Sequence, residues 1–128
     1  MTRRAEQSFQ IEVARYLQLV LLPEVAWTAF PAGGGGKTRG AILKAMGLKS
    51  GWPDLILIYN GKMLGLELKT PIGKLSKAQK AMHSALEAAG AAIAICRCTE
   101  DIVATLQAGE VPMRRHTMYP TGAVRVYP

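Results

Sequence analysis

The chain has 128 residues, and 49% of them are hydrophobic, which suits a single globular domain with an ordinary core. No stretch approaches the roughly 18 apolar residues of a membrane span, and the first residues lack the unbroken apolar core of a signal peptide. The two cysteines, Cys96 and Cys98, lie two residues apart, too close along one strand to staple distant segments. These features exclude a transmembrane helix and a disulfide scaffold, and they predict a cytoplasmic protein that is not secreted.

Basic residues clearly outnumber acidic ones. Sixteen lysines and arginines against nine aspartates and glutamates give a net charge of +7. A charge of this sign favours a polyanionic partner, most simply nucleic acid. A basic domain that is merely soluble fits the charge equally well, so the partner has to be argued from motifs.

The first part of the chain is predicted to form a helix and a short strand. Apolar residues recur at helical spacing from about residue 4 to residue 22, where Pro23 ends the pattern. Glu6 and Gln10 lie one turn apart on the side of this helix that carries Val13. Taken alone, Glu6 is more simply explained as a solvent-exposed acid that complements the helix dipole. Residues 25–30 follow as a strand.

A glycine-rich, cationic loop follows this strand. Its backbone can approach a ligand closely because glycine has no side chain in the way, and a short helix is predicted beyond it for residues 38–46. For any single lysine near the expected site, a solvated surface residue is an equally good explanation. Together, the residues expected to contact the phosphates of a nucleic-acid partner are Gly34, Gly35, Gly36, Lys37, Arg39, Lys74 and Lys77.

The second part reads as two paired strands, a helix, a strand and a final helix. Residues 55–59 are continuously apolar, as in a buried strand, and Asn60-Gly61 is a strong hairpin signal that returns the chain over residues 63–68. Ser76 and Gln79 form a capping box that opens a helix through residue 89. Residues 92–98 read as a buried strand and residues 100–108 as a helix.

This order of elements predicts an α/β fold with helices on both faces of a mixed, four-stranded sheet. We expect one domain over residues 1–128, with a core at about residues 4–108 and a tail at residues 109–128. The sequence of the tail is compatible with an added edge strand.

The segment PDLILIYNGKMLGLELK holds Asp54, Glu67 and Lys69. Alternate residues of a strand point to one face, so Glu67 and Lys69 project together and Asp54 joins them from the neighbouring strand. The alternate leucines would pack the other face and leave Glu67 and Lys69 to line a cleft. Hard carboxylate oxygens favour Mg²⁺ or Mn²⁺, and such an ion activates water for phosphodiester hydrolysis. In the alternative, Asp54 caps a turn and the other two are solvated neighbours.

With these motifs the chain resembles the PD-(D/E)xK nuclease superfamily, and within it the virus-type replication-repair nuclease (VRR-NUC) domain of the stand-alone phage or bacterial type. The resemblance covers most of the chain, from about residue 6 to residue 98. The family pattern usually has a Gly-Val-Pro-Asp type sequence, from which this chain departs at Trp52. The matching elements are Glu6 and Gln10, the glycine loop, Gly51-Trp52-Pro53-Asp54, Glu67-Leu68-Lys69, and Gly73-Lys74-Leu75-Ser76 with Gln79.

The resemblance implies a restriction-endonuclease-like core of topology αβββαβ and gives roles to individual residues. Lys69 would be the catalytic lysine, and Gln79 a polar residue that lines the site. Glu6 would be the acid that completes the site from the first helix, in place of its exposed role. The implied metal ligands are Glu6, Asp54, Glu67 and the main-chain carbonyl of Leu68.

The resemblance also implies a Mg²⁺- or Mn²⁺-dependent endodeoxyribonuclease of DNA repair that cuts branched DNA, with Holliday-junction resolution as the leading activity. It implies a homodimer, which the two-fold symmetry of a four-way junction independently favours. A general DNA nuclease and a non-catalytic nucleic-acid-binding module stay as alternatives. A nucleotide-binding phosphate loop is disfavoured, because Pro31 stands where G-x-x-x-x-G-K-[ST] requires glycine.

Overall fold

The structure, a computed structural model, describes residues 3–30 and 36–128. Within this part, no helix is long and apolar enough to span a membrane. The predicted helices and strands are present, with boundaries moved by one or two residues. The elements are α1 (Arg3–Val20), β1 (Ala26–Ala29), α2 (Gly36–Ala45), β2 (Leu55–Tyr59), β3 (Lys62–Leu68), α3 (Lys77–Ala88), β4 (Ala92–Cys96), α4 (Thr99–Ala108), β5 (His116–Met118) and β6 (Val124–Val126).

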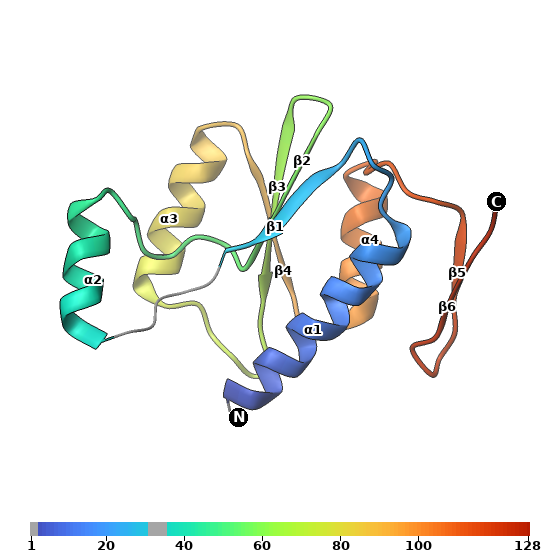
Figure 1. Ribbon diagram of the computed structural model, residues 1–128, viewed down its shortest axis with the longest axis horizontal. Helices are drawn as coiled ribbons and strands as arrows, with labels where there is room; N and C mark the ends of the chain where they lie inside the picture. Colours follow the sequence, from blue (N-terminus) through green and yellow to red (C-terminus); the bar gives the residue numbers. More distant parts are fainter. Residues whose placement is uncertain (1–2, 31–35) are drawn as a thin grey trace.

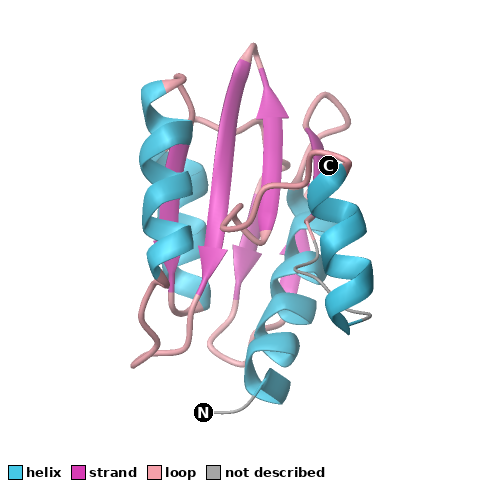
Figure 2. Cartoon of the chain, turned by 90° about the vertical axis from the view of Figure 1, so that its left-hand side faces the viewer, coloured by secondary structure: helices cyan, strands magenta, loops and turns pink. Residues whose placement is uncertain are grey.

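The first four strands form one mixed sheet in the order β1-β2-β3-β4. Strands β1, β2 and β3 pair antiparallel, whereas β4 runs parallel to β3 and is reached through α3. Helices cover both faces: α1 and α4 pack on one, and α3 covers the other, with α2 lying beyond it (Figures 1 and 2). The predicted α/β fold with a mixed four-stranded sheet is therefore confirmed.

The face of the sheet toward α1 and α4 carries the main hydrophobic core. Leu55, Leu57 and Leu66 point to this face from β2 and β3 and are completely buried. They belong to one cluster with Leu17 of α1 and Ile102 of α4. Burial of one such side chain stabilises the fold by about 1.5–3 kcal/mol. Because this face supplies so much apolar burial, the opposite face is free to carry polar groups.

The β2–β3 hairpin determines which residues meet on that opposite face. The turn residues Asn60-Gly61 have positive φ values of 48° and 73°, as a two-residue type I′ turn requires. The register pairs Leu55 with Leu66. The next residues outward, Asp54 and Glu67, therefore stand opposite each other across the two strands.

Gly51 holds the segment before β2 against the first turn of α3. That helix begins with the predicted capping box, in which Ser76 Oγ accepts from the Gln79 N–H and Gln79 Oε1 accepts from the Ser76 N–H. A Cβ on Gly51 would lie 2.3 Å from the carbonyl oxygen of Ala78, and Gly51 has a φ of +90°. Both features require glycine. The contact keeps the start of α3 beside the segment that leads to Asp54.

The C-terminal tail forms a separate two-stranded ribbon rather than an edge strand of the main sheet. Strands β5 and β6 pair with each other. The residues that lead into the ribbon run beside the end of α1, where the Leu22 N–H donates to Pro112 O and the Arg114 N–H donates to Val20 O. These bonds dock the start of the tail against the end of α1 rather than against a strand of the main sheet.

We expect Gly51→Ala to destabilise the fold more than Gly47→Ala. The two glycines have φ values of +90° and +106°, so alanine is strained at either position, by about 1–3 kcal/mol. Only at Gly51 would the new Cβ also meet backbone atoms, since nothing lies within 4 Å of a Cβ at Gly47. Denaturant unfolding of both variants measures the difference. Equal losses would contradict the close contact between Gly51 and α3.

Candidate active site

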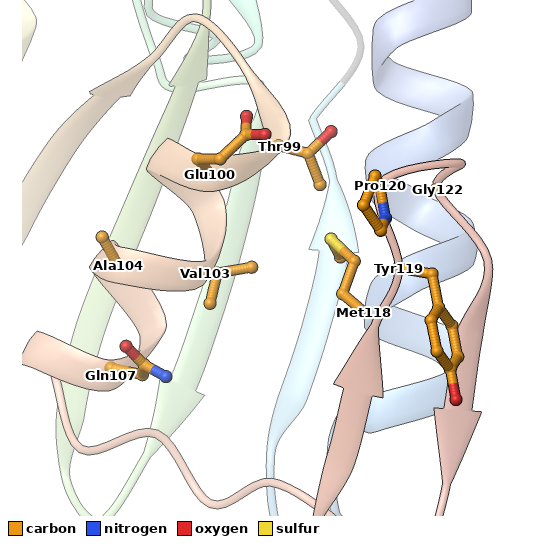
Figure 3. A pocket seen from close by; sticks show the side chains of 9 residues that line it. All are labelled: Thr99, Glu100, Val103, Ala104, Gln107, Met118, Tyr119, Pro120 and Gly122. Atoms are coloured by element: carbon orange, nitrogen blue, oxygen red, sulfur yellow. The ribbon is translucent and has the colours of Figure 1, made fainter.

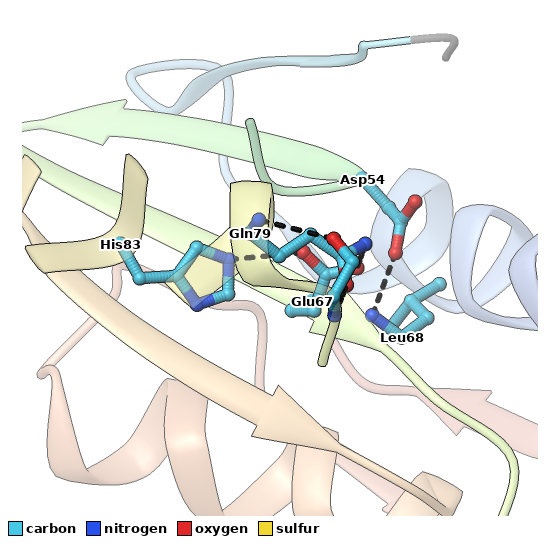
Figure 4. A network of polar contacts seen from close by, with 6 residues as sticks. Asp54, Glu67, Leu68, Gln79 and His83 are labelled. Carbon is cyan, nitrogen blue, oxygen red and sulfur yellow. Dashed lines mark hydrogen bonds and ion pairs between the residues drawn. The ribbon is translucent and has the colours of Figure 1, made fainter. Parts of the chain in front are cut away.

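Asp54 and Glu67 form an acidic pair at the open end of the β2–β3 hairpin (Figure 4). The Leu68 N–H donates to Asp54 Oδ2 at 2.7 Å, which fixes the Asp54 carboxylate against β3. Glu67 is 1% exposed and points to the face that α3 covers. The register of the hairpin thus brings Asp54 and Glu67 together, and α3 covers Glu67.

Two side chains of α3 hold the buried carboxyl group of Glu67 (Figure 4). Gln79 Nε2 donates to Glu67 Oε2 at 3.3 Å, and His83 Nε2 lies 3.0 Å from Glu67 Oε1. Because Gln79 Oε1 is occupied by the Ser76 N–H, the amide presents its NH₂ group to Glu67. Both oxygens of Glu67 are therefore hydrogen-bonded, and the structure brings the predicted residue Gln79 directly to the acidic pair.

Burial, and after it the neighbouring Asp54 carboxyl group, together raise the pKa of Glu67 to about 8. The charge of Lys69 acts in the opposite direction. Burial also lowers the pKa of His83. The distance between Glu67 and His83 is short enough for an ion pair, but both shifts favour the uncharged forms. We therefore regard the two side chains as a hydrogen-bonded pair without net charge at neutral pH.

Lys69 and Glu6 lie near the acidic pair. The Lys69 N–H donates to Cys96 O at 3.0 Å, which continues the pairing of β3 with β4. Glu6 is exposed in the first turn of α1, and its charge is the smallest of the influences that raise the pKa of Glu67. Among the described residues, no three histidine, cysteine, aspartate or glutamate side chains are grouped to hold a metal ion. Asp54 and Glu67 thus come together with Lys69 beside them, and Glu6 stays outside their contacts.

Glu67 does not line an open cleft, in contrast to what the alternation of leucines along β3 predicted. Residues 64–68 are all buried, because α3 covers the polar side of the strand as α1 and α4 cover the apolar side. Asp54 and Lys69 are only half-buried. A ligand therefore has to reach Glu67 from the end of the strand, past these two side chains.

His83 belongs to the site although no sequence motif marks it. It is buried and contacts Glu67 directly. A signal was present in the spacing, since His83 lies four residues after Gln79 and both side chains project from one side of a helix. The capping box at Ser76 fixes where that helix starts and hence which side faces β3.

Arg97, directly after β4, is a supporting residue that no sequence motif marks. Its Nη1 donates to the carbonyl oxygens of Thr70 and Gly73, both at 2.7 Å. Its own N–H donates to Asp101 Oδ2 at 2.8 Å. The side-chain bonds hold the turn that follows Lys69, and they thereby help to fix the path of the backbone at Lys69.

Trp52 stacks on Phe30 beside the acidic pair. The ring centres are 5.5 Å apart with an angle of 23° between the planes. The Phe30 N–H donates to Asp54 O at 2.8 Å, so the stack is tied to the backbone of the acidic pair. The unusual tryptophan before Pro53-Asp54 is thus accommodated by an aromatic partner at the end of β1.

The predicted phosphate contacts fall on two exposed surfaces. Lys37 and Arg39 are exposed on α2, a helix without any buried residue. Lys74 and Lys77 are exposed just before α3 and in its first turn. Gly36 begins α2. Gly34 and Gly35 lie outside the described residues.

A cleft of about 520 Å³ lies away from the acidic pair, between α4 and the β5–β6 ribbon (Figure 3). Val103 and Met118 line it from the two sides, and Glu100 is its single carboxylate. It shares no residue with the acidic pair. The acidic pair, with two carboxyl groups and a lysine, is the better candidate for chemistry.

Comparison with known proteins supports the fold. No protein-family model matches the sequence, and no curated protein matches it either. A solved structure described as a VRR_NUC domain protein has a TM-score of 0.65 and 20% sequence identity, covering 80% of this chain and 85% of that chain. At this identity the likeness concerns the fold, and the α/β core that the sequence resemblance implied is the one found.

We expect Glu67 to make the stability of the chain fall as the pH rises. Its pKa is about 8 in the folded chain against an ordinary value of 4.5, so between these values the folded state binds a proton that the unfolded state has lost. The free energy of unfolding then falls through this window, by at most about 1.4 kcal/mol per pH unit.

Glu67→Gln has no carboxyl group at this position to titrate, so its stability does not fall for this reason. Its free energy of unfolding relative to that of the wild-type chain should therefore rise from about pH 5 to about pH 8, as measured by urea unfolding in EDTA. A difference that stays constant over this range would contradict the raised pKa.

Proposed function

We propose that this chain is a metal-dependent endonuclease that hydrolyses phosphodiester bonds in DNA. The observation that carries the proposal is the acidic pair itself, with two carboxyl groups held together, Glu67 buried and Lys69 beside it. A buried carboxyl group next to another is costly to ionise, and such strongly shifted groups are concentrated at functional sites. The fold likeness to a VRR_NUC domain protein supports the same function.

The donor atoms of the pair fit a small divalent cation. Asp54 and Glu67 offer hard carboxylate oxygens, and the main-chain carbonyl of Leu68 follows directly. Mg²⁺ is commonly held by one or two carboxylates with water completing its shell, so the set does not require a third acid in contact. Mn²⁺ accepts the same ligands. We propose Glu6, whose charge already influences Glu67, as the outer acid of the set.

The chemistry divides among the residues of the site. A divalent cation bound here supplies activation of water and screening of the phosphate charge. His83 and Gln79 hold the carboxyl group of Glu67 in one orientation, which fixes where its oxygens present themselves. Lys69 would place a positive charge where negative charge develops on the phosphate, and it is suited to orient the attacking water.

Exposed basic residues on α2 and at the start of α3 support DNA as the substrate. The exposed cations Lys37, Arg39, Lys74 and Lys77 suit contacts to phosphates, which position DNA but carry no sequence information. We propose branched DNA, and the Holliday junction in particular, because of the sequence resemblance, together with a homodimer that would present two active sites to a two-fold symmetric junction. The same backbone contacts suit a general DNA nuclease, which is the second candidate.

The proposal is tested by incubating the pure protein with labelled four-way junction, flap, duplex and single-stranded DNA in Mg²⁺, Mn²⁺ or EDTA. We expect cleavage with either metal, fastest on the four-way junction, and none in EDTA. Asp54→Asn and Lys69→Ala should each lower the rate at least about 100-fold. Lys62→Ala removes an exposed lysine from the other end of β3 and should cut at the wild-type rate.

Two outcomes would contradict this mechanism. One is cleavage that survives EDTA, and the other is an equal rate in Lys69→Ala and Lys62→Ala. Equal cutting of all four DNA substrates would remove the preference for junctions and leave the nuclease.

Mg²⁺ or Mn²⁺ should also raise the Tm of the wild-type chain, because an ion that binds only the folded state stabilises it. At a concentration about 100-fold above the dissociation constant, the free energy of unfolding rises by about 2.7 kcal/mol. Asp54→Asn and Glu67→Gln should lose this stabilisation by the ion. Glu100→Gln, which alters the carboxylate of the cleft between α4 and the ribbon, should keep it. A gain that persists without either member of the acidic pair would place the ion elsewhere.

A further inference from the structure

The C-terminal segment carries positive charge that the proposed active site does not use. Glu110 is the last acidic residue of the sequence, and Arg114, Arg115 and Arg125 follow it. All three arginines are exposed, and within the described part of the chain none of them forms an ion pair. A cluster of like charges without internal compensation suits a polyanionic partner.

The β5–β6 ribbon sorts its side chains onto two faces. The register pairs Thr117 with Arg125, and the Tyr127 N–H donates to Arg115 O at 2.9 Å. Residues at paired positions share a face, so Arg115, Thr117, Arg125 and Tyr127 together form the outer ribbon face. The inner face, with Met118, packs against the hydrophobic core.

Both arginines of the outer ribbon face gather around one aromatic ring. Arg115 Cζ lies 5.3 Å and Arg125 Cζ 5.1 Å from the centre of the Tyr127 ring. The Tyr127 hydroxyl is in turn 3.1 Å from Thr117 Oγ1. Cation–π contacts attract a guanidinium group to the face of the ring, so the ring orders the two guanidinium groups without neutralising them. Ordered guanidinium groups match the geometry of phosphate oxygens.

The ribbon is fixed to α1, the helix whose first turn carries Glu6. His116 Nδ1–H donates to Arg114 O, and His116 Nε2 is hydrogen-bonded to the Tyr16 hydroxyl at 2.7 Å. The Arg114 N–H donates to Val20 O at 2.7 Å. The ribbon and α2 lie at opposite ends of the molecule, with the sheet between them (Figure 1). DNA held at the acidic pair and at α2 therefore leaves the outer ribbon face free for another stretch of backbone.

We propose that the outer ribbon face binds the phosphate backbone of a second DNA segment, separate from the segment at the acidic pair. This inference rests on the proposed action on DNA. Contacts from two guanidinium groups position a backbone and read no sequence. The face would thus favour a substrate with more than one arm by its shape alone.

The salt dependence of binding to a four-way junction, measured by fluorescence anisotropy in EDTA, tests this proposal. Log affinity falls with log salt by about 0.9 for each phosphate neutralised, so Arg115→Gln/Arg125→Gln should make the slope shallower by about 1.8. Arg115→Lys/Arg125→Lys keeps both charges and should retain the wild-type slope. A control is Lys62→Gln, which removes one exposed charge at the Asn60-Gly61 turn and should also leave the slope unchanged.

An unchanged slope in the glutamine pair would overturn the proposal. An equal loss in the lysine pair would overturn it too, because the loss would then come from the structure of the ribbon. A decrease of the slope in Lys62→Gln that is half as large as in the glutamine pair, the share of one charge, would show that any exposed charge counts equally, and this would also overturn the proposal.

The readout separates this proposal from the nuclease proposal, because binding is measured without cleavage. If the variants show the expected slopes but the wild-type chain cuts no DNA, the ribbon contact is supported and the nuclease proposal is rejected. If the wild-type chain cuts DNA but the glutamine pair leaves the slope unchanged, only the ribbon contact is rejected.

Discussion

The placement of a buried carboxyl group, Glu67, directly against a second one, Asp54, is the constraint around which the site is built. Ionisation of Glu67 in this position is opposed by desolvation and by the neighbouring charge. Gln79 and His83 of α3 satisfy the buried carboxyl group of Glu67 with hydrogen bonds. A bound divalent cation would make two ionised carboxylates favourable together, which is why we propose metal chemistry for the acidic pair.

One face of the sheet carries the hydrophobic core, and the other carries the candidate active site. The face toward α1 and α4 holds almost the whole apolar core, including Leu55 and Leu66. The opposite face therefore tolerates the cost of a polar cluster. The hairpin joins the two roles, because the register that buries the leucines on one face is the register that sets Asp54 against Glu67 on the other.

Local patterns made most of the fold predictable, and tertiary packing explains what they missed. The Asn60-Gly61 turn and the Ser76 capping box are local signals, and they place the β2–β3 hairpin and the start of α3 correctly. The depth of Glu67 depends on what covers β3, which alternation along one strand does not reveal. The Arg97 bonds to the turn after Lys69 likewise join segments that are distant in sequence.

A divalent cation bound at the acidic pair, as we propose, would displace the proton that burial holds on Glu67. The most direct measurement is proton release during titration of the chain with Mn²⁺ at about pH 7, in weakly buffered solution. With a pKa of about 8 for Glu67, we predict release of close to one proton for each ion bound by the wild-type chain and none in Glu67→Gln. Binding without proton release, or equal release by Glu67→Gln, would contradict it.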